Sequence, residues 1–355
     1  MTWQRILDAA HSPQAIANAD DDRLPGRIIS QQGPVRFVVT PEGLLECRPS
    51  GSLSYLIELG SSPAPAVGDY VTVSASGGRI ETVLPRFSVF ERKEAGDRAV
   101  AQVLCANVDA VLLVTTGPAE RDYSIRRLER FLATLDPSVK AIIVLNKSDL
   151  ESDAESVARA TRAEIPNAMV VPLSAAHGTG VDRLCDLLPE RGTIAVAGSS
   201  GSGKSTLIAR LTGEQLQTGD IRENDGRGRH TTTGRSMYPL GDHAILVDTP
   251  GVREVQLWAG ESPDAQLANA FPEITAAASG CKFSDCSHHH EPECAVLEAV
   301  QSGEIPHSRY LSYLELHEEL KGNAAREGAR SQKQERLLSR RVARKARVKR
   351  RSRGG

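Results

Sequence analysis

The stretch that most constrains how this chain folds is Gly198-Ser-Ser-Gly-Ser-Gly-Lys-Ser-Thr206, which fits the pattern G-x-x-x-x-G-K-[S/T]. Its glycines let the backbone wrap a phosphate, and its N–H groups point inward at a helix N-terminus. A strand-like run precedes it and a helix-like run follows, which a Gly/Ser-rich linker matching by chance does not explain. Lys204 is expected to reach the β- and γ-phosphates, and Ser205 to ligate Mg²⁺. The predicted phosphate site consists of Gly198, Ser199, Ser200, Gly201, Ser202, Gly203, Lys204, Ser205 and Thr206.

A second set of motifs concerns the base of the nucleotide. Asn146-Lys-Ser-Asp149 fits N-K-x-D and follows an apolar run. The Asp149 carboxylate can accept both N1–H and N2–H of guanine, whereas adenine would leave it unpaired. Lys147 is expected to lie over the base and Asn146 to brace neighbouring loops. A charged turn is the alternative for this tetrapeptide alone, but Ser174-Ala175 ends the next strand as the guanine S-A motif should, so GTP and GDP are predicted rather than ATP.

A third motif, Asp248-Thr-Pro-Gly251, fits D-x-x-G and ends an apolar run. Asp248 is expected to hold Mg²⁺ through water, and the Gly251 N–H to meet the γ-phosphate. Residues 213–235 are polar and rich in Gly and Arg, which suits a mobile switch with a threonine on Mg²⁺. Ras-like GTPases carry a water-orienting glutamine after D-x-x-G, but this chain has Val252, so slow intrinsic hydrolysis is predicted. His230 in the switch stretch is the candidate substitute, the alternative being a histidine that faces RNA or solvent.

The order of these motifs indicates a circular permutation. An ordinary GTPase runs P-loop, switch threonine, D-x-x-G, N-K-x-D and S-A, whereas here N-K-x-D and S-A come first and D-x-x-G last. Apolar runs alternate with helical spacing from residue 108 onward, which predicts a doubly wound α/β domain. Strands are expected at 108–114, 141–145, 168–173, 193–197 and 244–247, and helices at 124–132, 154–163, 181–188 and from 205.

Before this domain the apolar period changes to two. Short runs separated by turn signals predict strands at 27–30, 35–39, 44–48, 55–59, 70–74 and 79–84. About seventy residues of short strands indicate a small closed β-barrel, OB-like or SH3-like. Whether the barrel binds RNA or is purely structural stays open at this level.

After D-T-P-G comes the cysteine-rich segment Cys281-x₄-Cys286-x-His288-x₅-Cys294. Three thiolates and one imidazole satisfy a tetrahedral structural Zn²⁺ and leave no open position for chemistry. The neighbouring His289 and His290 are competing ligands that spacing alone does not exclude. Scattered cytosolic thiols are the alternative. Helices are expected at 295–302 and 308–321.

Composition places the chain among cytoplasmic proteins without a membrane span. It has 355 residues, lacks 18 uninterrupted apolar residues, and does not begin with a secretory signal. The formal charge of −2 hides a basic tail, because residues 321–355 hold 14 Lys and Arg against 2 Asp and Glu. A polyanion is the expected partner of that tail. We divide the chain into an N-terminal extension (1–24), an OB-like barrel (25–95), a permuted GTPase domain (96–258), a helical zinc domain (259–320) and the tail (321–355).

A barrel, a permuted GTPase domain and a Cys₃His knuckle in this order resemble the RsgA (YjeQ) family of small ribosomal subunit biogenesis GTPases. The resemblance covers residues 25–320 and includes Gly228-Arg-His-Thr-Thr-Thr233 and Cys281-Lys-Phe-Ser-Asp-Cys-Ser-His288. It implies a GTPase that docks on a late 30S precursor, contacts rRNA, hydrolyses GTP to GDP and phosphate there, and is a monomer away from the ribosome. It places the catalytic histidine at His230 and the Mg²⁺-binding switch threonine at Thr232. It implies nothing for the extension or the tail.

Two other functions stay open at the level of sequence. One is a permuted GTPase acting on the large subunit, against which the N-terminal barrel and the Cys₃His knuckle argue. The other is a GTP-gated RNA-binding module in which hydrolysis is incidental.

Overall fold

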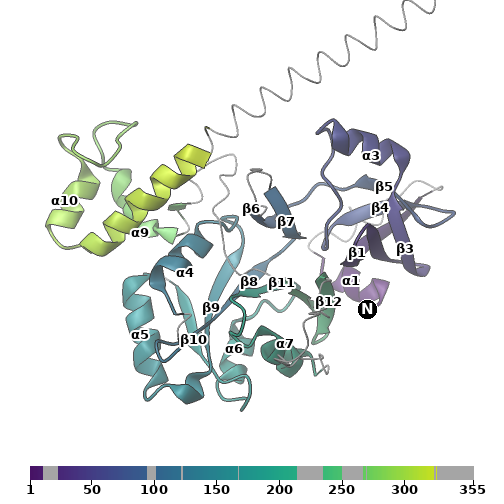
Figure 1. The fold of residues 1–355 in the computed structure, drawn as a ribbon, viewed down its shortest axis with the longest axis horizontal. Helices are drawn as coiled ribbons and strands as arrows, with labels where there is room; N and C mark the ends of the chain where they lie inside the picture. The colour runs from purple at the N-terminus through teal and green to yellow at the C-terminus, as the bar shows by residue number, and fades with distance from the viewer. Residues whose placement is uncertain are drawn as a thin grey trace, which may run out of the picture.

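A computed structural model describes residues 1–10, 23–93, 101–120, 123–166, 168–213, 235–249, 267–268, 270–323 and 325. Along the chain these residues form a β-barrel, a central α/β unit and a C-terminal group of helices (Figure 1). No helix within those ranges has the length and the apolar character that crossing a membrane requires. The predicted combination of barrel, doubly wound sheet and helical domain is confirmed.

The barrel contains five strands and closes on itself. Its strand order is β1-β2-β3-β5-β4, and β4 returns to pair with β1. The parallel contact between β3 and β5 and the antiparallel remainder give the topology of an OB barrel, as predicted. Its strands are β1 (Arg23–Gln32), β2 (Val35–Thr40), β3 (Gly43–Pro49), β4 (Tyr70–Ser74) and β5 (Arg79–Val83).

One predicted barrel strand is wrong. Residues 55–58 belong to a helix, α3 (Gly51–Glu58), which follows β3, and Leu59 is its C-cap. The Ser50 side chain caps its N-terminus by accepting a hydrogen bond from the Leu53 N–H at 3.2 Å. Leu53 is buried while Tyr55 is exposed, so one face of the helix packs on the barrel. A run of five residues is too short for its periodicity to distinguish a strand from a helix, and the Ser50 cap favours the helix.

A hairpin that sequence analysis did not predict connects the barrel to the central unit. It consists of β6 (Val89–Lys93) and β7 (Ala101–Ala106). Phe90 on β6 is buried against Phe131 of helix α4 (Ile125–Leu132), with ring centroids 5.6 Å apart. The hairpin therefore packs on the α/β unit as well as leading into it.

The central sheet has the order β10-β9-β8-β11-β13-β12, of which the first five strands are parallel and β12 is antiparallel. Apolar residues cover both of its faces, as parallel strands require. Helices α4 and α5 pack on one face, and α6 and α7 on the other. The strands are β8 (Ala110–Thr116), β9 (Lys140–Asn146), β10 (Met169–Pro172), β11 (Gly192–Gly198), β12 (Arg235–Leu240) and β13 (Ala244–Asp248). The helices are α4 (Ile125–Leu132), η1 (Ser148–Leu150), α5 (Ala154–Glu164), α6 (Val181–Leu187) and α7 (Lys204–Thr212).

Barrel and central sheet are continuous with each other. Ser30 and Gln31 of β1 pair with Ser236 and Arg235 of β12, so eleven strands form one sheet. The N-terminal helix α1 (Trp3–Asp8) lies against this junction in Figure 1. Its Arg5 donates a hydrogen bond to the Gly241 carbonyl at 2.6 Å.

The C-terminal helices are α9 (Pro272–Ala278), α10 (Ala295–Gln301) and a helix over residues 307–323. The last of these docks on α4 through a buried ion cluster. Arg309 is 1% exposed and contacts Glu129 of α4 at 2.6 Å and Glu273 of α9 at 2.6 Å. Its guanidinium also lies 4.4 Å from the centroid of the Phe271 ring.

Candidate guanine-nucleotide site and metal centre

The predicted phosphate loop connects β11 to α7 at the carboxyl edge of the sheet. Gly198, Gly201 and Gly203 have φ angles of 146°, 84° and 87°, which L side chains rarely adopt. A Cβ at Gly198 would collide with the Val114 carbonyl, and one at Gly203 with the Asn146 amide. The loop therefore needs glycine at these two positions both for conformation and for close packing on β8 and β9.

Asn146 connects three segments that the sequence analysis placed at the nucleotide. Its Nδ2 donates to the Ser202 carbonyl at 2.7 Å, and its Oδ1 accepts from the Ala175 N–H at 2.9 Å. Both contacts are buried. The P-loop, the N-K-x-D segment and the S-A segment are thus fixed to one another by a single side chain.

The charged groups expected around the phosphates and Mg²⁺ also gather at this edge. Lys204 begins α7, and its Nζ donates to the Ser199 carbonyl within the loop. Asp248 ends β13 beside Val196 of β11 and is 8% exposed. Burial raises the pKa of Asp248 above its usual range, and the nearby Lys204 charge opposes that rise. A cation at this edge would stabilise the ionised carboxylate in the same way.

Neighbouring side chains contact the lysine and the aspartate of the N-K-x-D segment. Lys147 adopts a left-handed conformation with φ of 60°, and its Nζ lies 3.6 Å from Glu120 Oε1. A hydrogen bond from the Ser174 hydroxyl lowers the pKa of Asp149 below its usual range, and His177 adds to the effect. His177 Nδ1 is 3.7 Å from Asp149 Oδ1 and 3.0 Å from Ser174 Oγ. An ionised Asp149 is the form that accepts two donors from guanine.

Three contributors to this arrangement were missed in the sequence. Arg210 of α7 donates to the carbonyls of Ala175 and Ala176 at 3.1 and 2.6 Å, and so holds the S-A segment. Thr249 Oγ1 donates to the Val196 carbonyl at 2.6 Å, which ties D-T-P-G to β11. His177 is the third. Each acts through a backbone carbonyl or a neighbouring side chain, for which no motif exists.

Several predicted site residues lie outside the described residues. These are His230, Thr232 and Gly251.

The structure brings the four predicted zinc ligands together. The ligand atoms of Cys281, Cys286, His288 and Cys294 all lie within 4.8 Å of one another. Cys281 Sγ is 3.8 Å from Cys294 Sγ, and His288 Nδ1 is 3.6 and 3.5 Å from these two sulfurs. A tetrahedral ion with Zn–S of about 2.3 Å and Zn–N of about 2.0–2.1 Å requires about 3.8 Å between two sulfurs and about 3.5–3.6 Å between nitrogen and sulfur. The donor set and its spacing therefore fit Zn²⁺.

The chemical state of the thiols agrees with a metal centre. All six cysteines, each within the described residues, are free thiols. Desolvation, followed by the neighbouring Cys294 and Cys281, raises the pKa of the Cys286 thiol to about 11. Desolvation opposes ionisation of Cys281 as well, but hydrogen bonds at the Val296 and Ala295 backbone and to the neighbouring cysteines lower the pKa of its thiol. A bound cation would favour the thiolate form of all three cysteines. His289 and His290, the competing ligands, are exposed and lie outside the cluster.

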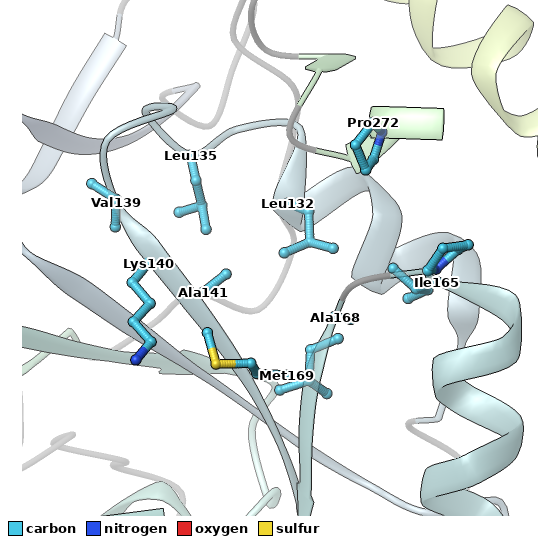
Figure 2. A pocket seen from close by; sticks show the side chains of 11 residues that line it. Leu132, Leu135, Val139, Lys140, Ala141, Ile165, Ala168, Met169 and Pro272 are labelled. Atoms are coloured by element: carbon cyan, nitrogen blue, oxygen red, sulfur yellow. The ribbon is translucent and has the colours of Figure 1, made fainter. Parts of the chain in front are cut away.

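A cavity of about 200 Å³ lies away from both sites, between α4, the start of β9, the start of β10 and α9 (Figure 2). Lys140 and Met169 on its wall begin their strands, whereas the nucleotide motifs follow the strand ends. Ligands of open α/β sheets bind at the carboxyl edge, so this cavity is not the nucleotide site. Its lining is Leu132, Leu135, Val139, Lys140, Ala141, Ile143, Ile165, Pro166, Ala168, Met169 and Pro272.

The fold and the order of its motifs define a circularly permuted GTPase. A family model described as RsgA GTPase matches residues 83–258. The chain is 40% identical over 332 residues to the small ribosomal subunit biogenesis GTPase RsgA of Opitutus terrae, covering 89% of this chain and 88% of that protein. It is 42% identical over 303 residues to the protein of the same name from Methanosarcina acetivorans, covering 84% and 79%. The chain belongs to the RsgA family of GTPases, which bind guanine nucleotides with Mg²⁺.

Solved structures agree with this assignment. YjeQ from Thermotoga maritima is similar to this chain with a TM-score of 0.62 at 29% identity, covering 84% of this chain and 99% of that one. YloQ, described as a circularly permuted GTPase, gives a TM-score of 0.59 at 24% identity and supports the fold alone. The prediction of a GTP-hydrolysing enzyme with a permuted motif order is confirmed.

Proposed function

We propose that this GTPase acts in late maturation of the small ribosomal subunit. It docks on precursor subunits through rRNA contacts in its GTP-bound form and hydrolyses GTP to GDP and phosphate there. The observation that carries the proposal is the likeness to the Opitutus terrae protein, which runs through 89% of this chain and is not confined to the GTPase domain. Ribosomes mature in the cytoplasm, and we place the enzyme there as a monomer when it is off the ribosome.

We assign the nucleotide contacts as follows. Asp149 selects guanine, with Lys147 over the base and Asn146 bracing the P-loop against the Ser174-Ala175 segment. The amides of residues 198–206 and Lys204 hold the phosphates. When bound, Mg²⁺ neutralises charge that develops on the phosphates during transfer. Ser205, Thr232 and Asp248 are the residues that would hold it, and Gly251 would report the γ-phosphate.

We assign water positioning to His230. Val252 has no polar atom with which to orient a water molecule. Hydrolysis then depends on a partner that orders the switch and brings His230 to the water. We also propose that Cys281, Cys286, His288 and Cys294 hold one structural Zn²⁺.

The deciding measurement is steady-state GTP turnover with purified small subunits, with large subunits and with free rRNA. Stimulation by small subunits alone is expected. Stimulation by large subunits would indicate a large-subunit GTPase instead. Binding to all three partners in the GTP form, with no stimulation by any, would indicate a GTP-gated RNA-binding module.

A further inference from the structure

One carboxylate collects four hydrogen bonds inside the cysteine-rich loop. Glu291 Oε1 accepts from the Ser287 N–H at 3.0 Å and from the Ser287 hydroxyl. Its Oε2 accepts from the His289 N–H at 3.0 Å and from the His290 N–H at 3.2 Å. The residues on both sides of His288 are therefore attached to one anionic side chain.

The residue between these attachment points has an unusual backbone. His288 adopts a φ of 61°, in the left-handed region that a non-glycine residue enters at a cost. Its Nδ1 nevertheless lies 3.6 and 3.5 Å from the sulfurs of Cys281 and Cys294. Its carbonyl accepts from the Tyr310 hydroxyl at 2.7 Å, so the helix over 307–323 holds it from the other side.

We propose that Glu291 is a positioning residue of the metal centre. Its carboxylate fixes residues 287–290 so that His288, and neither His289 nor His290, supplies the nitrogen ligand. The role rests on the proposed zinc site. A further negative group beside three thiolates does not stabilise them electrostatically, so we infer that Glu291 contributes by fixing the shape of the loop.

The four hydrogen bonds that Ser287, His289 and His290 donate to Glu291 require a carboxylate. Two ionised oxygens offer about four acceptor sites, which match the four donors. A glutamine would present one oxygen and one N–H₂ group, and the latter would face donors of the loop. The strain at His288 would then be released, and the imidazole would leave its position opposite the sulfurs. Replacing a group that orients a metal ligand typically weakens metal affinity about 10–100-fold. We expect an effect of about that size when the hydrogen bonds to Glu291 are lost.

The test compares two glutamates of the same loop. The Glu293 side chain forms an ion pair with Lys282 and is 66% exposed, so Glu293→Gln removes the same charge without touching the hydrogen bonds to Glu291. Zinc release from the full-length protein to a chromogenic chelator is measured for wild type, Glu291→Gln and Glu293→Gln. We expect release about 10–100-fold faster for Glu291→Gln, and the wild-type rate for Glu293→Gln.

A milder variant covers the case in which Glu291→Gln does not fold. Ser287→Ala removes one of the four donors and should speed release by a smaller factor. Its Co²⁺-substituted form should show a changed d–d spectrum, which reports the ligand geometry directly. Wild-type release from Glu291→Gln, or from Ser287→Ala if that variant is used instead, would overturn the role of Glu291 alone. A wild-type chain that contains no zinc would overturn the proposed site and this role with it.

Discussion

At the scale of single residues, our assignment of guanine selection to Asp149 relies on a carboxylate that stays ionised. Asp149→Asn should weaken GTP binding at least about a hundredfold, because the amide no longer accepts two guanine donors. Xanthosine triphosphate should gain affinity, since the amide can donate to the C2 carbonyl of xanthine. Titration of fluorescent nucleotides measures both. Asp153→Asn, which keeps the cap on α5, is the matched control. Equal affinity of the wild type for ATP and GTP would contradict the assignment.

Catalysis is argued at the same scale. His230→Ala should keep GTP-dependent docking, because imidazole contacts no phosphate before the reaction, while the turnover stimulated by small subunits falls about a hundredfold. Thr232→Ala should lose more, because without its oxygen on Mg²⁺ docking itself no longer distinguishes GTP from GDP. Single-turnover hydrolysis and subunit co-sedimentation separate the two outcomes. Wild-type turnover by His230→Ala on the subunit would move the role to Arg227, Arg229 or a ribosomal group.

At the scale of elements, the periodicity of apolar residues predicts those strands and helices whose burial pattern is visible in the local sequence. Continuous apolar runs located the strands of the central sheet near their true bounds. Strand β12 was not predicted because its residues are partly polar and Pro239 lies within it. The proline is tolerated there because β1 pairs with β12 at Arg235 and Ser236, away from Pro239. Helix α3 was predicted as a strand because residues 55–59 are too few for their periodicity to distinguish a helix from a strand. The buried Arg309 was not predicted, since arginine is normally exposed and its partner Glu129 lies 180 residues away.

The contact between α4 and the helix over 307–323 carries its own prediction. Arg309→Met should destabilise folding by about 3–5 kcal/mol, because it leaves the buried Glu129 and the partly exposed Glu273 without their partner. Arg126 pairs with Glu315 across the same two helices, but both side chains are 63% exposed. Arg126→Gln should therefore cost less than about 1 kcal/mol and serves as the control. Urea denaturation compares them, and equal losses would mean that the buried cluster contributes no more than a surface pair.

At the scale of the whole molecule, the barrel and the nucleotide sheet are one structure. The shared sheet runs from β10 to β4, and a buried arginine reinforces the junction. Arg27 of β1 is fully buried, donates to Thr193 Oγ1 at 2.6 Å, and lies 4.6 Å from the centroid of the Tyr70 ring. Thr193 lies in β11, whose carboxyl end leads into the P-loop. A displacement of β1 would therefore be transmitted to β11, the strand that leads into the predicted phosphate loop, through the contact between Arg27 and Thr193.

Hydrogen exchange of the whole chain tests this junction. Arg27→Met should increase amide exchange in both β1 and β11, because it removes a buried donor from Thr193 and from the Gly68 carbonyl at once. Arg36→Met is the matched control, since Arg36 donates to the carbonyls of Gly33 and Pro65, both of which lie outside the central sheet. Exchange in β11 should stay at the wild-type rate in that control. Faster exchange in β1 alone for Arg27→Met would show that the barrel loosens without affecting the strand that leads to the phosphate loop, and would refute the coupling.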